Sequence, residues 1–131
     1  MGSIRLFCAV LTIQIAAAAS GFANEAVIHL PARDVAALID TDRDIRVLDV
    51  RFGFEYSKGH IEGAQRINYL SPFFRRDVSR LDRSARWVVH CKSGHRSIGA
   101  VRIMAGLGFI QIIHMDGGFD AWRKADLPIA Q

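Results

Sequence analysis

The fold of this chain can be read outward from one stretch, Cys91-Lys92-Ser93-Gly94-His95-Arg96-Ser97. Residues 87–90 precede it and form a short apolar, β-branched run that is typical of a buried parallel strand. Residues 98–107 follow it and are nearly apolar on all sides, which predicts a packed helix. In open α/β sheets, ligands bind where the carboxyl end of a strand turns into a helix. We therefore expect an α/β fold with a site on this loop.

The residues of the loop are of the kinds that stabilise a thiolate. Backbone amides of a tight turn and the positive end of the following helix favour negative charge on a nearby sulfur. Lys92, His95 and Arg96 add cationic or potentially cationic side chains. Because the thiolate is the nucleophilic form of cysteine, we interpret Cys91 as the catalytic nucleophile and residues 92–97 as the loop that binds its substrate. The structural alternative is a small core cysteine, which would not need these polar neighbours.

Metal ligation is the other chemistry open to this set of residues, because Cys91 and His95 are four positions apart. The remaining histidines stand at positions 29, 60, 90 and 114, and their spacing matches no known zinc site. We predict no metal site. Trp87 and Trp122 are interpreted as core residues, and no cofactor is expected.

The composition is that of one globular domain. The chain has 131 residues, half of them hydrophobic, which is enough for a core without disulfides or a metal. Its net charge of +4 suits a small anion, and no basic run interleaved with aromatics indicates a nucleic-acid partner.

Residues 1–23 have the layout of a secretory signal peptide, and residues 24–131 are predicted to form the domain. Arg5 supplies the positive charge, residues 6–19 are uncharged and mostly apolar, and small residues precede Asn24. A membrane span needs about 20 apolar residues, so we expect a periplasmic protein without stable membrane association after cleavage. An uncleaved N-terminal anchor is the alternative. Cleavage would also remove Cys8, which leaves no partner for an intramolecular disulfide.

Short strands and helices alternate along the rest of the chain. Strands are predicted at residues 26–30, 45–50, 64–67, 88–89 and 110–115. Helices are predicted at residues 31–39, 71–81, 98–107 and 119–125, with a short one near residue 55 and with Ser71 as the N-cap of the second. This order implies a single parallel sheet with helices on both faces.

Three stretches resemble the signatures of the rhodanese family. Residues 49–64 resemble its N-terminal signature, from Asp-Val-Arg through Gly-His-Ile-x-Gly-Ala, and residues 91–97 resemble its Cys-x-x-Gly-x-Arg-Ser active loop. Residues 117–122, with Leu127-Pro128 beyond, resemble its C-terminal signature. The resemblance implies a five-stranded parallel sheet and transfer of the outer sulfur of a small anionic donor such as thiosulfate. The sulfur would be carried as a persulfide on Cys91 to cyanide or a thiol, including a protein thiol.

The other loop residues have expected roles around that sulfur. Gly94 would let the backbone curl so that successive amides converge on one atom. Lys92 is expected at the mouth, where it would attract a dianion, and His95 is expected to face solvent. Arg96 has two open interpretations, substrate contact or an ion pair that braces the loop.

Four residues before the loop are expected to support it. Asp49, Arg51 and Glu55 would form one set of ion pairs and hydrogen bonds after the second strand, and His60 would be structural.

Two other functions compete with sulfur transfer. Cysteine-dependent phosphatases of related folds use a Cys-x5-Arg loop, and this chain has Cys-x4-Arg, one residue shorter. A periplasmic sulfur carrier that hands its persulfide to one protein would use the same Cys91 chemistry.

Overall fold

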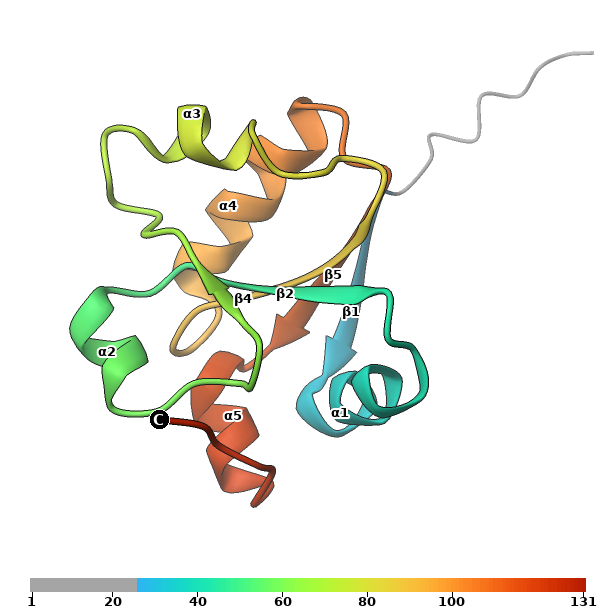
Figure 1. Cartoon of the computed structure of the whole chain (residues 1–131), viewed down its shortest axis with the longest axis vertical. Helices are drawn as coiled ribbons and strands as arrows, with labels where there is room; N and C mark the ends of the chain where they lie inside the picture. The colour runs from blue at the N-terminus through green and yellow to red at the C-terminus, as the bar shows by residue number, and fades with distance from the viewer. Residues whose placement is uncertain (1–25) are drawn as a thin grey trace, which may run out of the picture.

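The computed structural model describes residues 26–131, which form a five-stranded, all-parallel sheet (Figure 1). Neighbouring strands are, in order, β1 (Val27–Pro31), β5 (Gln111–Asp116), β4 (Arg86–His90), β2 (Ile45–Asp49) and β3 (Gln65–Arg66). The predicted α/β fold with a five-stranded parallel sheet is confirmed. The predicted signal peptide falls outside the described residues.

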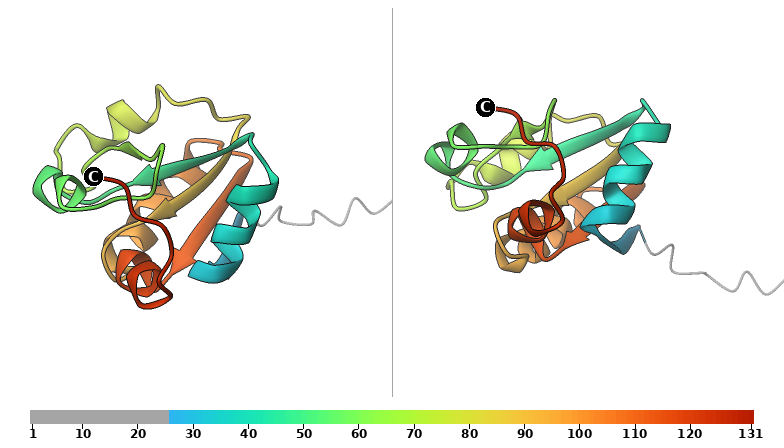
Figure 2. Two further views of the ribbon diagram at one scale, coloured as in Figure 1. Left: turned by 60° about the horizontal axis from the view of Figure 1, so that its bottom comes forward. Right: turned by 90° about the horizontal axis from the view of Figure 1, so that it is seen from below.

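Helices cover both faces of the sheet. Helices α1 (Ala32–Thr41) and α5 (Gly118–Lys124) bury side chains in one core cluster, and α3 (Phe74–Val78) and α4 (His95–Gly106) do so in the other. The short helix α2 (Gly53–Ser57) follows the carboxyl end of β2. After α5 the chain runs back toward α2, where the backbone of Ala130 pairs with that of His60 (Figure 2). No helix among residues 26–131 is long and apolar enough to cross a bilayer.

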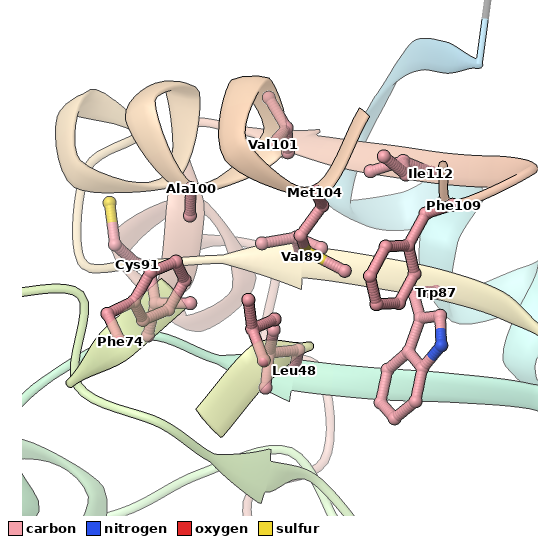
Figure 3. Close-up of a cluster of buried hydrophobic side chains, with 12 residues drawn as sticks. Leu48, Phe74, Trp87, Val89, Cys91, Ala100, Val101, Met104, Phe109 and Ile112 are labelled. Carbon is pink, nitrogen blue, oxygen red and sulfur yellow. The ribbon is translucent and has the colours of Figure 1, made fainter. Parts of the chain in front are cut away.

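The alternation of side chains along β4 decides which face receives the loop cysteine. Trp87, Val89 and Cys91 belong to the core cluster on the α3–α4 face (Figure 3). Val88 belongs to the opposite cluster, and the ring of His90 stacks on Phe119 of α5 at 6.1 Å. Successive residues of a strand point to opposite faces, so Cys91 faces α4 while its neighbour His90 faces α5.

Two helices differ from their predicted bounds by three residues at one end or both. The helix expected at residues 71–81 is only α3, and Ser71 is not its N-cap, because Phe73 occupies that position. The Ser71 hydroxyl accepts a hydrogen bond from the amide of Phe73 at 3.1 Å, in the turn before the helix. Such local bonds compete with helix formation. Helix α4 begins three residues earlier than expected, because Gly94 turns the chain at φ 111° directly into the helix. His95, Arg96 and Ser97 therefore lie in its first turn.

Candidate active site

Cys91 directly follows β4, between the carboxyl ends of β5 and β2. Its sulfur points toward the beginning of α4, at one end of the core cluster (Figure 3). The residue is only 1% exposed. Any reagent that reaches the sulfur must therefore be narrow at its reacting atom.

The loop and the first turn of α4 provide hydrogen-bond donors to this sulfur. The amide of Gly94 lies 3.1 Å from Sγ, and the hydroxyl of Ser97 lies 3.4 Å from it. Burial disfavours the thiolate, but hydrogen bonds from the Ser97 hydroxyl and from the amides of Ser97, Gly94 and Ser93 outweigh burial and lower the pKa of the Cys91 thiol. The geometry thus favours an anionic, nucleophilic sulfur.

The start of α5 holds the other side of the loop backbone (Figure 1). The amide of Phe119 donates to the carbonyl of Cys91 at 2.8 Å, and the amide of Asp120 donates to the carbonyl of Lys92 at 2.9 Å. Gly118 makes this approach possible: a Cβ there would lie 2.6 Å from the Cys91 oxygen and 2.5 Å from the Lys92 oxygen. Because the amides at the start of α5 hydrogen-bond to these two carbonyls, the carbonyls point away from the sulfur and the loop amides that follow can face it.

Of the two interpretations of Arg96, substrate contact or a bracing ion pair, the structure shows the ion pair. Its guanidinium makes two hydrogen bonds to the Glu55 carboxylate, Nη1 to Oε2 at 2.8 Å and Nη2 to Oε1 at 2.9 Å. The hydrogen bond from Arg96, against the effect of burial, lowers the pKa of Glu55. The amide of Phe52 also donates to Glu55, at 2.9 Å. This pair joins α2 to the first turn of α4 and so fixes the loop between β4 and α4.

The prediction that Asp49, Arg51 and Glu55 form one supporting set is wrong. The structure divides these residues into two separate ion pairs. Asp49 and Arg51 form a buried ion pair with Nη2 and Oδ2 2.7 Å apart, and Arg51 also donates to the carbonyl of Gly59 at 2.8 Å. Glu55 pairs with Arg96 instead, since α2 turns its side chain toward α4. His60 lies apart from the sulfur, with its ring stacked on Tyr56 at 3.8 Å.

The remaining loop side chains lie at the surface. Lys92, which was expected at the mouth to attract a dianion, is exposed, and its Nζ lies 2.8 Å from Asp120, which balances its charge. The hydroxyl of Ser93 and the ring of His95 are hydrogen-bonded to each other at 3.2 Å, and both residues are exposed.

A cavity of about 250 Å³ lies beside the loop, with Lys92 in its wall. Its charged lining residues are four cations, Arg51, Lys58, Lys92 and Arg123, and two carboxylates, Glu55 and Asp120. Cys91 is not among the lining residues. Sequence reasoning missed Lys58 and Arg123, because only the folded chain brings α2 and α5 to the loop. The excess of positive charge favours an anion in this cavity.

Two buried histidines behind the loop were also missed as site residues. His90 bonds the carbonyl of Cys91 through Nδ1 at 3.0 Å, and burial lowers its pKa, which favours the neutral ring. Its Nε2 has no hydrogen-bond partner among residues 26–131. His114 lies 2.7 Å from the Ser97 hydroxyl through Nε2. A signal for both existed in the sequence, since His90 ends one apolar strand and His114 interrupts another.

Comparison with known proteins identifies the family. The rhodanese-like domain model matches residues 31–125. The chain belongs to the rhodanese family. The resemblance inferred from the three signatures is thereby confirmed.

Named relatives support membership of a sulfurtransferase family. The chain is 30% identical over 122 residues to the probable adenylyltransferase/sulfurtransferase MoeZ of Mycobacterium tuberculosis, covering 93% of this chain and 30% of that protein. It therefore spans less than a third of MoeZ. It is 29% identical over 100 residues to the thiosulfate sulfurtransferase GlpE of Shewanella oneidensis, covering 75% of this chain and 94% of GlpE.

Solved structures share the fold. A rhodanese-related protein from Thermoplasma volcanium has a TM-score of 0.70 and 29% identity, over 78% of this chain and 96% of that chain. A protein from Rhodopseudomonas palustris, described as a possible tyrosine phosphatase, has a TM-score of 0.67 and 28% identity, over 82% of this chain and 88% of that chain.

Proposed function

We propose that the protein is a thiosulfate sulfurtransferase that moves the outer sulfur of thiosulfate to cyanide or a thiol through a persulfide on Cys91. The observation that carries the proposal is the set of donors on one buried sulfur, the Gly94 amide at 3.1 Å and the Ser97 hydroxyl at 3.4 Å. These donors stabilise the attacking thiolate, and they remain beside the anionic persulfide that forms on it.

The transfer balances without an oxidant or reductant. The Cys91 thiolate attacks the outer sulfur of thiosulfate, a new S–S bond forms, and the S–S bond of thiosulfate breaks as sulfite leaves with the electron pair. Cyanide or a thiolate then attacks the outer sulfur of the persulfide, and Sγ leaves as the thiolate that began the cycle. The cationic cavity beside Lys92 supports an anionic donor.

Two features of the site disfavour phosphate-ester hydrolysis. Both guanidinium nitrogens that could hold a phosphate on Arg96 are bonded to Glu55. The loop is also one residue shorter than the phosphatase pattern, and Cys91 is 1% exposed, which suits a single sulfur atom better than a phosphoryl group. Sulfur transfer is therefore the better fit.

Steady-state formation of thiocyanate from thiosulfate and cyanide tests the proposal. Wild-type protein should turn over, and Cys91→Ser should lose turnover while keeping its fold, since the two side chains are similar in size. Asp44→Asn is a surface control directly before the amino end of β2, whereas the loop lies at the carboxyl ends of the strands, and it should leave turnover unchanged.

Mass spectrometry after thiosulfate treatment separates the enzyme from a sulfur carrier. A gain of one sulfur atom on Cys91 without cyanide turnover would support a carrier that serves one protein acceptor. Failure to gain sulfur from thiosulfate would contradict the proposed donor.

We also propose that the protein is exported and cleaved near Asn24, on the pattern of residues 1–23. Intact mass of protein from the periplasmic fraction tests cleavage, and full-length chain in the membrane pellet would favour the anchor instead.

A further inference from the structure

Three side chains of metal-binding type meet at the carboxyl ends of β1 and β5. His29 of β1 is the register partner of His114 of β5, and Asp116 follows two residues later on the same face. The Nδ1 atoms of His29 and His114 each lie 2.9 Å from the same oxygen, Asp116 Oδ1. One ligand atom from each of the three residues lies within 4.8 Å of the others.

We propose that His29, His114 and Asp116 form a binding site for a divalent transition metal, with Zn²⁺ as the ion that suits them best. Two imidazole nitrogens and one carboxylate oxygen match the three protein ligands of open zinc sites, whose fourth position is left to water or another small ligand. Within the described part of the chain, the ion-pair partners of Asp116 are these two histidines alone. Its charge is thus not taken by an arginine or lysine.

The two contacts to Asp116 need only a small adjustment to hold the ion. Ligand atoms around tetrahedral zinc lie roughly 3.3 Å apart, given bonds of about 2.0–2.1 Å. The two hydrogen bonds at Asp116 are 2.9 Å long, so the site must open by a few tenths of an ångström. The side chains of His29 and Asp116 are each 54% exposed and free to move, whereas that of His114 is 3% exposed and anchors the site.

The buried histidine already has the outer contact that metal ligands usually make. A metal-bound histidine commonly donates its second ring N–H to a neighbouring polar group, which fixes the orientation of the ring. Here Nε2 of His114 lies 2.7 Å from the Ser97 hydroxyl.

Metal binding would change which group receives the single hydroxyl proton of Ser97. When Nδ1 of neutral His114 donates to Asp116, Nε2 is bare and competes with Cys91 Sγ for the one hydroxyl proton of Ser97. A metal on Nδ1 moves the ring proton to Nε2 with no net proton change, so Nε2 then donates to Ser97. The Ser97 hydroxyl is then left with two acceptors, Cys91 Sγ at 3.4 Å and the carbonyl of Gly94 at 3.1 Å. The ion would therefore remove one competitor for the Ser97 proton, and so favour the hydrogen bond that stabilises the Cys91 thiolate.

Zinc titration of tag-free Cys91→Ser protein tests the site without depending on sulfur transfer. Removing the thiol excludes a competing soft ligand, so failure of the proposed function and failure of the metal site can be told apart. We expect one zinc ion per chain at micromolar concentration. His29→Gln and Asp116→Asn in this background should each weaken binding by at least about tenfold.

The control in the same background is His95→Gln, which removes an exposed histidine of the loop and should leave zinc binding unchanged. Circular dichroism confirms that the variants are folded. Absence of micromolar binding, equal binding in His29→Gln and Asp116→Asn, or loss of binding in His95→Gln would each overturn the site.

The link to Cys91 is tested in protein that retains the thiol, by the rate of iodoacetamide alkylation at a fixed neutral pH. Zinc should raise the rate severalfold in wild type and leave the rate of Asp116→Asn unchanged. No change in wild type, slower alkylation, or the same response in both proteins would contradict the link.

Discussion

Replacing Gly118 by alanine is expected to disturb the active loop through the start of α5, although the residue lies 27 positions away from Cys91 in sequence. Gly118 has φ 59°, and a Cβ there would lie 2.5 Å from the carbonyl oxygen of Lys92. That distance is roughly 1 Å inside ordinary van der Waals contact. Since the atom in the way is backbone, either the loop or α5 must move.

The magnitude follows from the strain and the two bonds that would be lost. A left-handed backbone costs an alanine about 1 kcal/mol. Weakening the bonds from Phe119 to Cys91 and from Asp120 to Lys92, at 2.8 and 2.9 Å, adds about 1 kcal/mol each. The total is about 3 kcal/mol in the free energy of unfolding.

Gly63→Ala is the matched control. Gly63 has φ 75°, but a Cβ there would meet no atom within 4 Å. This variant should carry only the backbone strain of about 1 kcal/mol. The difference of about 2 kcal/mol corresponds to roughly 10 °C in Tm for a domain of this size.

Thermal unfolding and cysteine alkylation together test whether the start of α5 holds the loop in place. Gly118→Ala should melt well below Gly63→Ala, and its Cys91 should react severalfold more slowly with iodoacetamide at neutral pH, because the displaced loop amides stabilise the thiolate less. If the two variants have the same Tm and the same alkylation rate, α5 does not hold the loop and the reasoning fails.

Other perturbations test the charges around the site. Glu55→Gln should cost about 2 kcal/mol, because it breaks a half-buried, two-bond pair with Arg96. Pairing lowers the pKa of Glu55 below its ordinary 4.5, so this stability is present above pH 4.5 and is lost as the pH falls through the lowered pKa. Urea unfolding should therefore show the difference in free energy of unfolding between wild type and Glu55→Gln becoming smaller in acid. A difference that does not depend on pH would contradict the pairing. The alkylation midpoint of Cys91 should lie at lower pH in the folded than in the unfolded chain, because its thiol pKa is lowered; coincident midpoints would count against the hydrogen bonds to Sγ. Asp120→Asn should raise kcat/KM for thiosulfate at low ionic strength and not at high salt, since it frees the charge of Lys92; equal ratios at both salts would show that Lys92 does not attract the donor. Aryl phosphate turnover should be negligible beside thiosulfate turnover, and Cys91-dependent phosphatase activity would overturn the proposed chemistry.

The bracing of the loop explains how a surface turn can hold a reactive sulfur in place. Glu55 of α2 holds the first turn of α4 through Arg96, and α5 holds the carbonyl of Cys91. The loop is thereby fixed from two helices that are distant in sequence. We infer that such bracing would keep the amides aimed at the sulfur during the proposed change from thiolate to persulfide.

Local features of the sequence were sufficient for the fold class and for the place of the candidate nucleophile in the fold. An apolar strand, a polar turn with Gly94 and an apolar helix follow one another in the chain, so the position of Cys91 at a strand end can be read without tertiary information. Alternating strands and helices likewise imply a parallel sheet. The helix expected at residues 71–81 is nevertheless only α3, and a turn at Ser71 replaces its expected beginning.

The partners of the loop side chains were decided only by the tertiary structure. Arg96 pairs with a residue 41 positions away, Lys92 with one 28 positions away, and Ser97 with His114, 17 positions away. The sheet order β1-β5-β4-β2-β3 brings together strands that are not consecutive in the chain. For the same reason His29 and His114 read as scattered in sequence and are register partners in the sheet. Periodicity encodes which face a side chain occupies, but which strand lies beside it depends on the packing of the whole core.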